Sequence, residues 1–553
     1  MPELTGDPGG RLAYSLRTEP KTLNPLVASD SASRDIIHQM HADLVHINRA
    51  TLESEPALAK SCRISADGLR YTIELRQGLR FSDGQPFDAD DVLFTFRVYL
   101  DARIGSPQRN LWILDGKPVE VRKLDQYRVE FRLPRVDAVG ERIFDSVPIL
   151  PRHLLERPYR EGRLLQVWTL DASPAEIAGL GPFRFKQALR GERVVLERNP
   201  YYWKRDAAGN RLPYLAELDF SPAGTEDREV LRFQAGETDV LNRIAARDYA
   251  ALARESERRG YVLRDAGPGF EYSFLFFNLS PAAEGSALAA RQAVWRRAAF
   301  RKAVSEAIDR EAIVRLVYRG YASALGSPVA AGNRPWIDSR LAPPARSVAK
   351  ARALLAADGF RWSKKGALLD PGGRPVAFTM IASSTNPERT EMAALIQADL
   401  KELGIAAEVA PLEFRSLADR VTRTRDFDAC ISAIASADAD PTADLNLWLS
   451  SGAQHYWNPS QKTPATAWEA EIDGLMEKQM VTRDRQARKR LFDRVQEIAM
   501  ENVPLIPLAT PHLLAGAKKD LANFRPAALD PYTLWNSEEL CWRAERRRAG
   551  RAR

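Results

Sequence analysis

Three aspartates in the segment SADADPTADL, residues 436–445, have the residue type and spacing that could hold a metal ion. Asp438, Asp440 and Asp444 would occupy the first, third and seventh positions of a calcium loop. The sixth position of that loop would be Ala443 where a glycine is needed, and the twelfth would be Leu449 where a glutamate is needed. The pattern therefore excludes a calcium loop.

A second set of potential metal ligands is formed by His38, His41 and His46, which we expect on or near one helix over about residues 33–46. The first two would share a face of that helix. Zinc also needs further ligands, and no cysteine or carboxylate cluster is recognisable beside these histidines in the sequence. We therefore predict no metal site and no cofactor.

Catalytic motifs are absent from the sequence. It has no G-x-S-x-G elbow, H-E-x-x-H pair, phosphate loop or dinucleotide-binding fingerprint. The three cysteines, Cys62, Cys430 and Cys541, lie far apart and have no CxxC spacing, which excludes a zinc ribbon or a dense disulfide framework. We expect a protein that is not an enzyme, although a secreted hydrolase with dispersed carboxylates stays open as an alternative.

The charge distribution argues against nucleic-acid binding. The net charge is +7, but the last twelve residues, WRAERRRAGRAR, hold six arginines and one glutamate, so the other 541 residues carry only about +2. With 553 residues, the chain is too long for one hydrophobic core. No apolar run reaches the roughly 20 residues that cross a bilayer. The N-terminus MPELTGDPGG shows no export signal, so we expect either a cytoplasmic protein or a leader removed before Met1.

The elements that position these residues begin with a strand that turns into a helix, over residues 71–101. Tyr71, Ile73 and Leu75 alternate with polar residues, as in a half-buried strand. After a turn at 82–84, Asp88 and Asp91 have the spacing that caps a helix. Further on, we predict a hairpin over 179–203 with its turn at Leu-Arg-Gly-Glu, and alternating strands and helices over 270–505.

The run over residues 75–92, Leu-Arg-x-Gly-Leu-x-Phe-Ser-Asp-Gly-x-Pro-Phe-x-Ala-Asp-Asp-Val, resembles the signature of the family 5 extracellular solute-binding proteins, the peptide-binding receptors of ABC importers. Other segments similar to this family occur along nearly the whole chain, in the order in which the family has them. One, Leu23-Asn24-Pro25, precedes this run, and the others follow it: GPFRF, LERNPYYW, FLFFNLS, FRKAVSEAIDREAIV, AKARALLAADGF and VPLIPL.

The resemblance implies an α/β fold with mixed sheets that is periplasmic-binding-protein-like, in the class with an extra inserted domain. We expect three lobes and a two-strand hinge, with hinge candidates at 267–269 and 504–507. Lobe I would comprise residues 11–47, 181–268 and 506–540. Lobe II would be the insertion 48–180, lobe III would span 269–505, and 541–553 would form a basic tail.

The resemblance also implies the function. We expect a monomeric periplasmic or extracytoplasmic receptor that captures a peptide or a solute of similar size between its lobes. It would deliver this ligand to an ABC permease complex in the membrane without chemistry. An oligosaccharide receptor of the same fold, which would use the 11 tryptophans as stacking platforms, stays open as an alternative.

In the peptide-binding relatives, an aspartate in an Ala-Asp-Tyr-x-x-Pro-like segment pairs with the α-ammonium of the ligand. The matching segment here has no tyrosine, and the residue four before Pro441 is Ala437, so Asp438 or Asp440 could take the role. A helix cap is the alternative for both. The other ligand-contact candidates that the resemblance implies are Asp30 and Ser31 in lobe I, Trp112 in lobe II, and Tyr272, Ser327, Trp448 and His455 in lobe III. For Trp448, a place in the core is the alternative.

Overall fold

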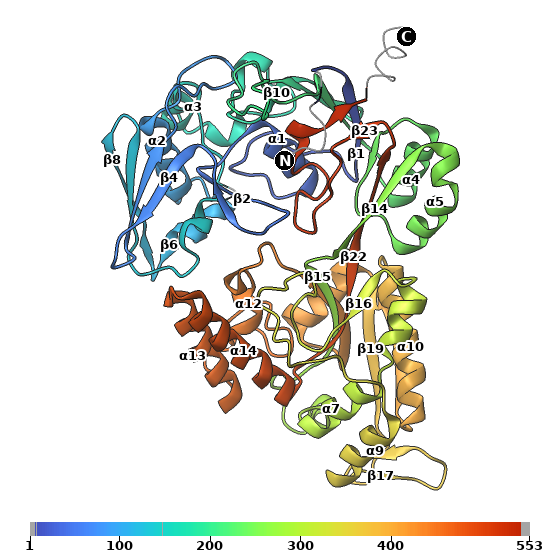
Figure 1. Cartoon of the computed structure of the whole chain (residues 1–553). Helices are drawn as coiled ribbons and strands as arrows, with labels where there is room; N and C mark the ends of the chain where they lie inside the picture. Colours follow the sequence, from blue (N-terminus) through green and yellow to red (C-terminus); the bar gives the residue numbers. More distant parts are fainter. Residues whose placement is uncertain (1–5, 7, 146, 544–553) are drawn as a thin grey trace. The chain divides into compact units, whose positions relative to one another are not determined.

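The computed structural model describes residues 6, 8–145 and 147–543, which excludes most of the predicted basic tail. The chain divides into two compact units (Figure 1). Unit 1 comprises Met1–Ala266 and Leu513–Arg553, and unit 2 comprises Gly267–His512. Two strands, β14 (Tyr261–Pro268) and β22 (Leu505–Lys518), carry the chain across the two boundaries. The finer division into three lobes stays a prediction.

The main sheet of unit 1 has the strand order β10 (Phe183–Leu189), β11 (Arg193–Arg198), β12 (Glu217–Pro222), β1 (Arg11–Leu16) and β13 (Val240–Leu241), and the end of β22 follows β13. The hairpin β10–β11 confirms the prediction for 179–203. Its turn closes with the Glu192 N–H donating to the Leu189 carbonyl at 3.0 Å. Gly191 has φ +72° there, a conformation that favours glycine.

A four-stranded antiparallel sheet of unit 1 contains the strand that opens the 71–101 segment. Its order is β4 (Ala59–Ile64), β5 (Arg70–Leu75), β9 (Arg128–Arg132) and β8 (Glu120–Asp125). After β5, helix α2 (Ala89–Leu100) starts with the predicted cap. The Asp90 N–H donates to Asp88 Oδ1 at 2.9 Å, and the Asp88 N–H donates to Asp91 Oδ2 at 3.1 Å. The prediction of a carboxylate cap is therefore confirmed.

One predicted helix is shorter than its pattern indicates. Helix α1 (Ser31–Met40) does not continue to residue 46, because His41 is extended, with φ −118° and ψ 167°. The Met40 carbonyl accepts the N–H of Gly181 at 2.9 Å, and a Cβ at Gly179 would lie 2.0 Å from that carbonyl oxygen. This close packing of a distant glycine segment ends the helix. His46 consequently lies on strand β2 (Val45–Ile47), which pairs with β3 (Ser54–Pro56).

The remaining elements of unit 1 are shorter strands and surface helices. They are α3 (Arg152–Arg160), α4 (Glu226–Ala235), α5 (Ala246–Arg259), β6 (Ile113–Leu114), β7 (Lys117–Pro118), β23 (Leu521–Ala522) and β24 (Cys541–Trp542).

The sheet of unit 2 has the order β22, β15 (Glu271–Phe277), β21 (Ala429–Ala435), β19 (Ala377–Ser383) and β20 (Ala406–Leu412). Strand β19 runs parallel to both β20 and β21, and β15 runs antiparallel to β21. Helix α10 (Pro387–Glu402) lies along β19 (Figure 1) and buries Met392, Ile396 and Leu400. The alternation of strands and helices predicted for this region is confirmed.

Further helices cover unit 2. They are α6 (Ala287–Trp295), α7 (Ala298–Ala307), α8 (Arg310–Ala312), α9 (Val348–Ala357), α11 (Phe414–Asp419), α12 (Leu445–Trp448), α13 (Ala467–Val481) and α14 (Arg485–Asn502), with the short strands β16 (Ala322–Ala324), β17 (Arg361–Trp362) and β18 (Leu368–Leu369). Among the described residues, no helix combines the length and apolar character needed to cross a membrane.

Candidate functional site

The parallel strands of unit 2 end at one edge of its sheet. Ser383, Leu412 and Ala435 are the last residues of β19, β20 and β21, and Glu271, the first residue of β15, pairs with Ala435. In open α/β sheets, ligands bind outside the carboxyl ends of the strands. The segment 436–444 follows β21 at this edge, and we call it the acidic loop. It begins with the Ser436 N–H donating to the Phe270 carbonyl at 3.0 Å.

Asp440 anchors the acidic loop from within. Its side chain is 5 % exposed and accepts two hydrogen bonds from the Arg488 guanidinium on α14, at 2.7 and 2.8 Å. It also accepts the Thr442 N–H at 3.0 Å and the Thr442 hydroxyl at 2.7 Å. The carboxylate is thus occupied as an ion pair and a cap, which was the alternative role for this residue. Its contact with a ligand stays a prediction.

The partners of the loop are themselves held in place. Arg488 also donates to Gln479 Oε1 at 2.6 and 2.8 Å, and its guanidinium lies 5.1 Å from the ring centre of Trp336. The Asn333 side chain donates to the Ala439 carbonyl at 2.8 Å. Buried hydrogen bonds of this kind hold a loop in one conformation, so the acidic loop is pre-organised.

The loop carries two further carboxylates, Asp438 and Asp444. Asp438 is half-buried and accepts the Ala439 N–H at 2.6 Å. Asp444 accepts the Ser436 hydroxyl at 2.5 Å, and burial together with the negative charge of Asp438 raises the pKa of Asp444 to about 6. Among the residues the structure describes, no lysine, arginine or histidine forms an ion pair with Asp444. Asp444 is therefore a largely buried carboxylate without a cationic partner among the described residues.

Tyr272 lies on β15 beside this loop. Its ring is 1 % exposed and packs at 5.5 Å from Phe274, and its hydroxyl has no hydrogen-bond partner within the described part of the chain. Burial raises the pKa of Tyr272 well above its usual value, and the Asp444 carboxylate adds to this effect. The neighbouring Glu271 pairs with Arg389 on the first turns of α10 at 3.4 Å. The structure thus brings Asp438, Asp440 and Tyr272 together.

The other candidates in unit 2 lie in its core. His455 is fully buried, with its Nδ1 2.9 Å from the Leu447 carbonyl and its Nε2 3.1 Å from Glu469 Oε1. Trp448 is 2 % exposed, and Ser327, 3 % exposed, donates to Gln496 Oε1 at 3.1 Å. These three side chains already have packing or hydrogen-bonding roles inside the unit, and their ligand contacts stay predictions.

In unit 1, the candidates occupy two different environments. Asp30 is the N-cap of α1 and accepts the Ser33 N–H and the Ser33 hydroxyl, each at 2.8 Å, while Ser31 is exposed beside it. Trp112 is fully buried, and its ring centre lies 4.7 Å from that of Phe96. Asp30 and Ser31 are accessible from solvent, whereas Trp112 is a core residue of its unit. For all three residues, ligand binding stays a prediction.

Several residues that build the loop were missed from the sequence. Ser436 and Asp444 lie in the segment 436–445, but the sequence does not predict either as a ligand contact. The predicted order of strands and helices could have located them, because parallel strands end at a common edge. No sequence pattern predicts the contacts of Asn333 and Arg488 with the loop, because they join residues 106 and 48 positions apart.

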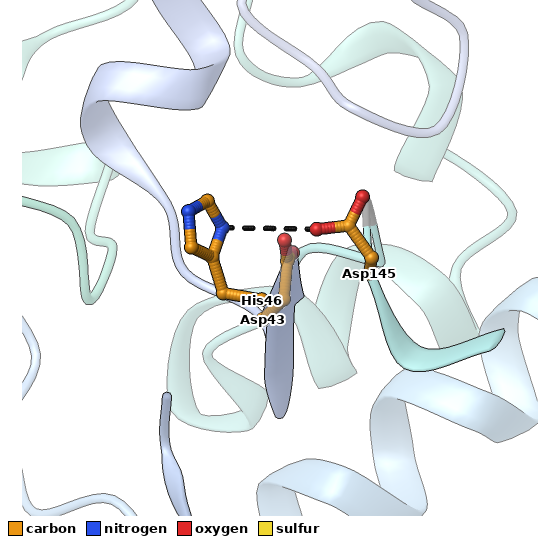
Figure 2. A group of neighbouring side chains, drawn as sticks. All are labelled: Asp43, His46 and Asp145. Atoms are coloured by element: carbon orange, nitrogen blue, oxygen red, sulfur yellow. Dashed lines mark ion pairs between the residues drawn. The ribbon is translucent and has the colours of Figure 1, made fainter. Parts of the chain in front are cut away.

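A second cluster, in unit 1, has the composition of a metal site (Figure 2). Asp43, His46 and Asp145 offer ligand atoms within 4.8 Å of one another. Neither carboxylate is predicted as a metal ligand from the sequence. However, the Arg49 guanidinium donates to both oxygens of Asp145, at 3.3 and 3.2 Å, and the Ile47 N–H donates to the same carboxylate at 2.8 Å.

The position of Arg49 decides against a cation at this cluster. Burial and the Arg49 charge lower the pKa of His46 to about 4, so its ring is neutral, but a divalent ion would lie beside a guanidinium. The cluster is better described as an arginine–aspartate pair that ties β2 to the segment at 145. The other histidine of interest, His41, stacks on Trp168 at 5.4 Å between ring centres.

Comparisons with known proteins agree with this architecture. The sequence profile of the bacterial extracellular solute-binding proteins, family 5, matches residues 53–456. The oligopeptide-binding protein AppA of Bacillus subtilis is 24% identical over 94% of this chain and 89% of its own length. The periplasmic alpha-galactoside-binding protein of Rhizobium meliloti is 26% identical over 90% of this chain and 74% of its own length. The crystal structure of the ABC transporter substrate-binding protein CtaP from Listeria monocytogenes superposes with a TM-score of 0.78, at 25% identity, covering 97% of this chain and all of CtaP.

Proposed function

Because this chain belongs to the bacterial extracellular solute-binding proteins of family 5, we propose that it is the receptor of an ABC importer that captures a peptide. The oligopeptide-binding relative AppA supports this choice of ligand class. The expected α/β fold with mixed sheets, of the periplasmic-binding-protein type, is confirmed by the match to CtaP.

The observation that carries the proposal is the Asp444 carboxylate of the acidic loop, which forms no ion pair with a cationic side chain among the described residues. A half-buried carboxylate without a cationic partner is unfavourable in the empty protein, as the raised pKa of Asp444 indicates. An ammonium group would compensate this charge through charge-assisted hydrogen bonds. We assign the α-ammonium of the peptide to Asp438 and Asp444, and the anchoring of the loop to Asp440.

The alpha-galactoside-binding relative supports the oligosaccharide alternative. The environments of the tryptophans argue against it. Seven of the 11 tryptophans have less than 10 % of their surface exposed, so they are not stacking platforms. Three of the others, Trp203, Trp362 and Trp535, have an arginine guanidinium 4.7–5.6 Å from the ring centre. A sugar ring would compete with these arginines for the aromatic face.

The remaining parts of the proposal concern partners and location. The receptor acts as a monomer outside the cytoplasmic membrane and presents its loaded form to the permease complex, without a cofactor, nucleic acid or chemical step. Mass spectrometry of a peptide incubated with the protein tests the last point: intact recovery supports a receptor, and cleavage supports a hydrolase. Small-angle scattering with and without peptide tests the two-strand hinge, because ligand-driven closure compacts the protein.

A thermal-shift titration tests the ligand class, because a ligand that binds only the native state raises the melting temperature. We expect a shift with trialanine, none with N-acetyl-trialanine, which lacks the α-ammonium, and none with cellotetraose. Asp438→Asn should reduce the trialanine shift at a given trialanine concentration. Asp426→Asn, which removes an exposed aspartate elsewhere in unit 2, is the matched control. A shift with cellotetraose alone would overturn the proposal.

A further inference from the structure

A pocket lies inside unit 2, away from the acidic loop. It has a volume of about 510 Å³ and is formed by α6, the start of α13 and the residues that follow β15. Leu279, in its wall, donates its N–H to the Trp457 carbonyl at 2.8 Å, whereas the acidic loop contacts Phe270 before β15 begins. The seven residues of β15 separate the two places by about 23 Å. The volume falls within the range of ligand-binding pockets.

The carboxylate in this pocket is already saturated. Glu469 is 2 % exposed and accepts hydrogen bonds from His455, Trp457, Gln461 and Thr466, at 2.8–3.1 Å. Although burial opposes it, these donors lower the pKa of Glu469 to about 2, so the side chain is ionised. Its lone pairs are taken by its own unit, and it offers little to a cationic ligand.

The two arginines of the pocket donate to uncharged carbonyl groups and not to carboxylates. Arg301 is 3 % exposed and donates to the backbone carbonyls of Trp295, Asn502 and Val503. Arg296, at the exposed rim, donates to the Ser280 carbonyl at 3.0 Å. Neither arginine has a carboxylate within ion-pairing distance in the described part of the chain. Two guanidinium groups thus face a pocket whose one carboxylate is occupied.

The rest of the lining is largely apolar. Leu279, Pro281, Ala289, Ala293 and Ala465 form the wall together with Trp468, which is half-buried. An aromatic face next to two guanidinium groups suits a flat molecule with an acidic group at one end. We propose that this pocket binds a small organic anion, with its carboxylate at Arg296 and Arg301 and its apolar body against Trp468.

Calorimetric titration of the full chain with 2-naphthoate tests this site, and 2-naphthamide is the uncharged control. We expect a dissociation constant of about 0.1 to 1 mM for the carboxylate, since a ligand of this size has a limited contact area, and at least about tenfold weaker binding of the amide. Arg296→Gln, at the exposed rim, should weaken 2-naphthoate about tenfold. Lys302→Gln makes the same charge change outside the pocket and should leave the affinity unchanged.

A second variant keeps the test independent of charge. Ala293→Trp places an indole in the mouth of the pocket and should abolish binding of 2-naphthoate without affecting a trialanine thermal shift. Equal affinity for the amide, an unchanged affinity in Ala293→Trp, displacement of 2-naphthoate by trialanine, or no heat up to several millimolar would each overturn the proposal. The outcomes other than displacement by trialanine do not depend on whether trialanine is a ligand, because 2-naphthoate binding is measured directly.

Discussion

The two units each contain a buried arginine–aspartate pair, and the comparison of these pairs separates structural support from ligand binding. In unit 1, Arg49 holds Asp145, and in unit 2, Arg488 holds Asp440. In both pairs the guanidinium contacts both carboxylate oxygens, and all four side chains are less than 10 % exposed. The same interaction therefore occurs twice in one chain.

The two pairs differ in what surrounds them. Asp145 accepts the N–H of Ile47, so the Arg49–Asp145 pair connects strand β2 to a distant segment. The Arg49 charge also makes the cluster of Asp43, His46 and Asp145 unfavourable for a metal ion. Asp440 caps the turn at Thr442 in a loop that also carries Asp438 and Asp444 at the carboxyl edge of a sheet. The Arg488–Asp440 pair belongs to a candidate site only because it positions the loop that carries Asp438 and Asp444.

The largest effects are expected when one partner of a pair is removed. Arg488→Leu and Arg49→Leu should each lower the free energy of unfolding by about 3–5 kcal/mol, because each leaves a buried carboxylate without its counter-charge. Urea unfolding measures this quantity. Only Arg488→Leu should also weaken peptide binding, and equal losses of peptide affinity in both variants would contradict the comparison.

The double variant Asp440→Leu with Arg488→Met refines this test. Apolar replacement of both partners should restore most of the lost stability, since no unpaired charge remains buried. Peptide affinity should stay low, because the loop has lost the cap at Thr442. A double variant with normal affinity would show that the pair does not position the loop.

The next effect concerns ligand affinity alone. Asp438→Asn should weaken trialanine binding by about 10- to 100-fold, the loss expected when a hydrogen bond to a charged group becomes neutral. Its free energy of unfolding should change by less than about 1 kcal/mol. Asp145→Asn is the matched variant in unit 1: calorimetry should find its peptide affinity normal and urea unfolding should find it destabilised.

The two regions should also respond to pH with opposite signs. The pKa of Asp444 is raised to about 6, so its contribution to stability is complete below the unfolded value of about 3.8 and is lost as pH rises to about 6. The pKa of His46 is lowered to about 4, so its contribution is lost as pH falls from about 6.5 to about 4. Each slope is at most about 1.4 kcal/mol per pH unit.

Urea unfolding at several pH values from 4 to 7 resolves these slopes as differences from the unmodified protein. Asp444→Asn should remove the loss on raising the pH, and His46→Asn should remove the loss on lowering it. Parallel pH profiles in the two variants would show that neither group titrates as its environment implies.

The smallest effect is expected at Tyr272. Tyr272→Phe removes a buried hydroxyl that has no partner in the described residues, so the free energy of unfolding should stay the same or rise by up to about 1 kcal/mol. Thermal unfolding without ligand measures this change. A loss of trialanine affinity in the same variant would identify the hydroxyl as a ligand contact, whereas a clear loss of stability would reveal a partner inside the protein.

The sequence alone was sufficient wherever the responsible contacts are local. The cap of α2 needs only Asp88 and Asp91, three positions apart, and the β10–β11 hairpin needs only alternation and a turn with Gly191. The family resemblance, the fold class and the segment that forms the acidic loop followed from the same kind of short pattern. Local hydrogen bonds and hydrophobic periodicity depend only on residues close together in the sequence, so they can be predicted without coordinates.

Only the tertiary structure decided the roles within the site. Asp438 and Asp440 were equivalent in the sequence, and the buried guanidinium of Arg488 made one an anchor and left the other half-exposed beside Asp444. In the same way, Gly181 ended α1 at Met40, although the helical pattern continued. Each outcome depends on a partner distant in the chain, whose burial sets the hydrogen bonds and the charge balance, and no local pattern encodes that partner.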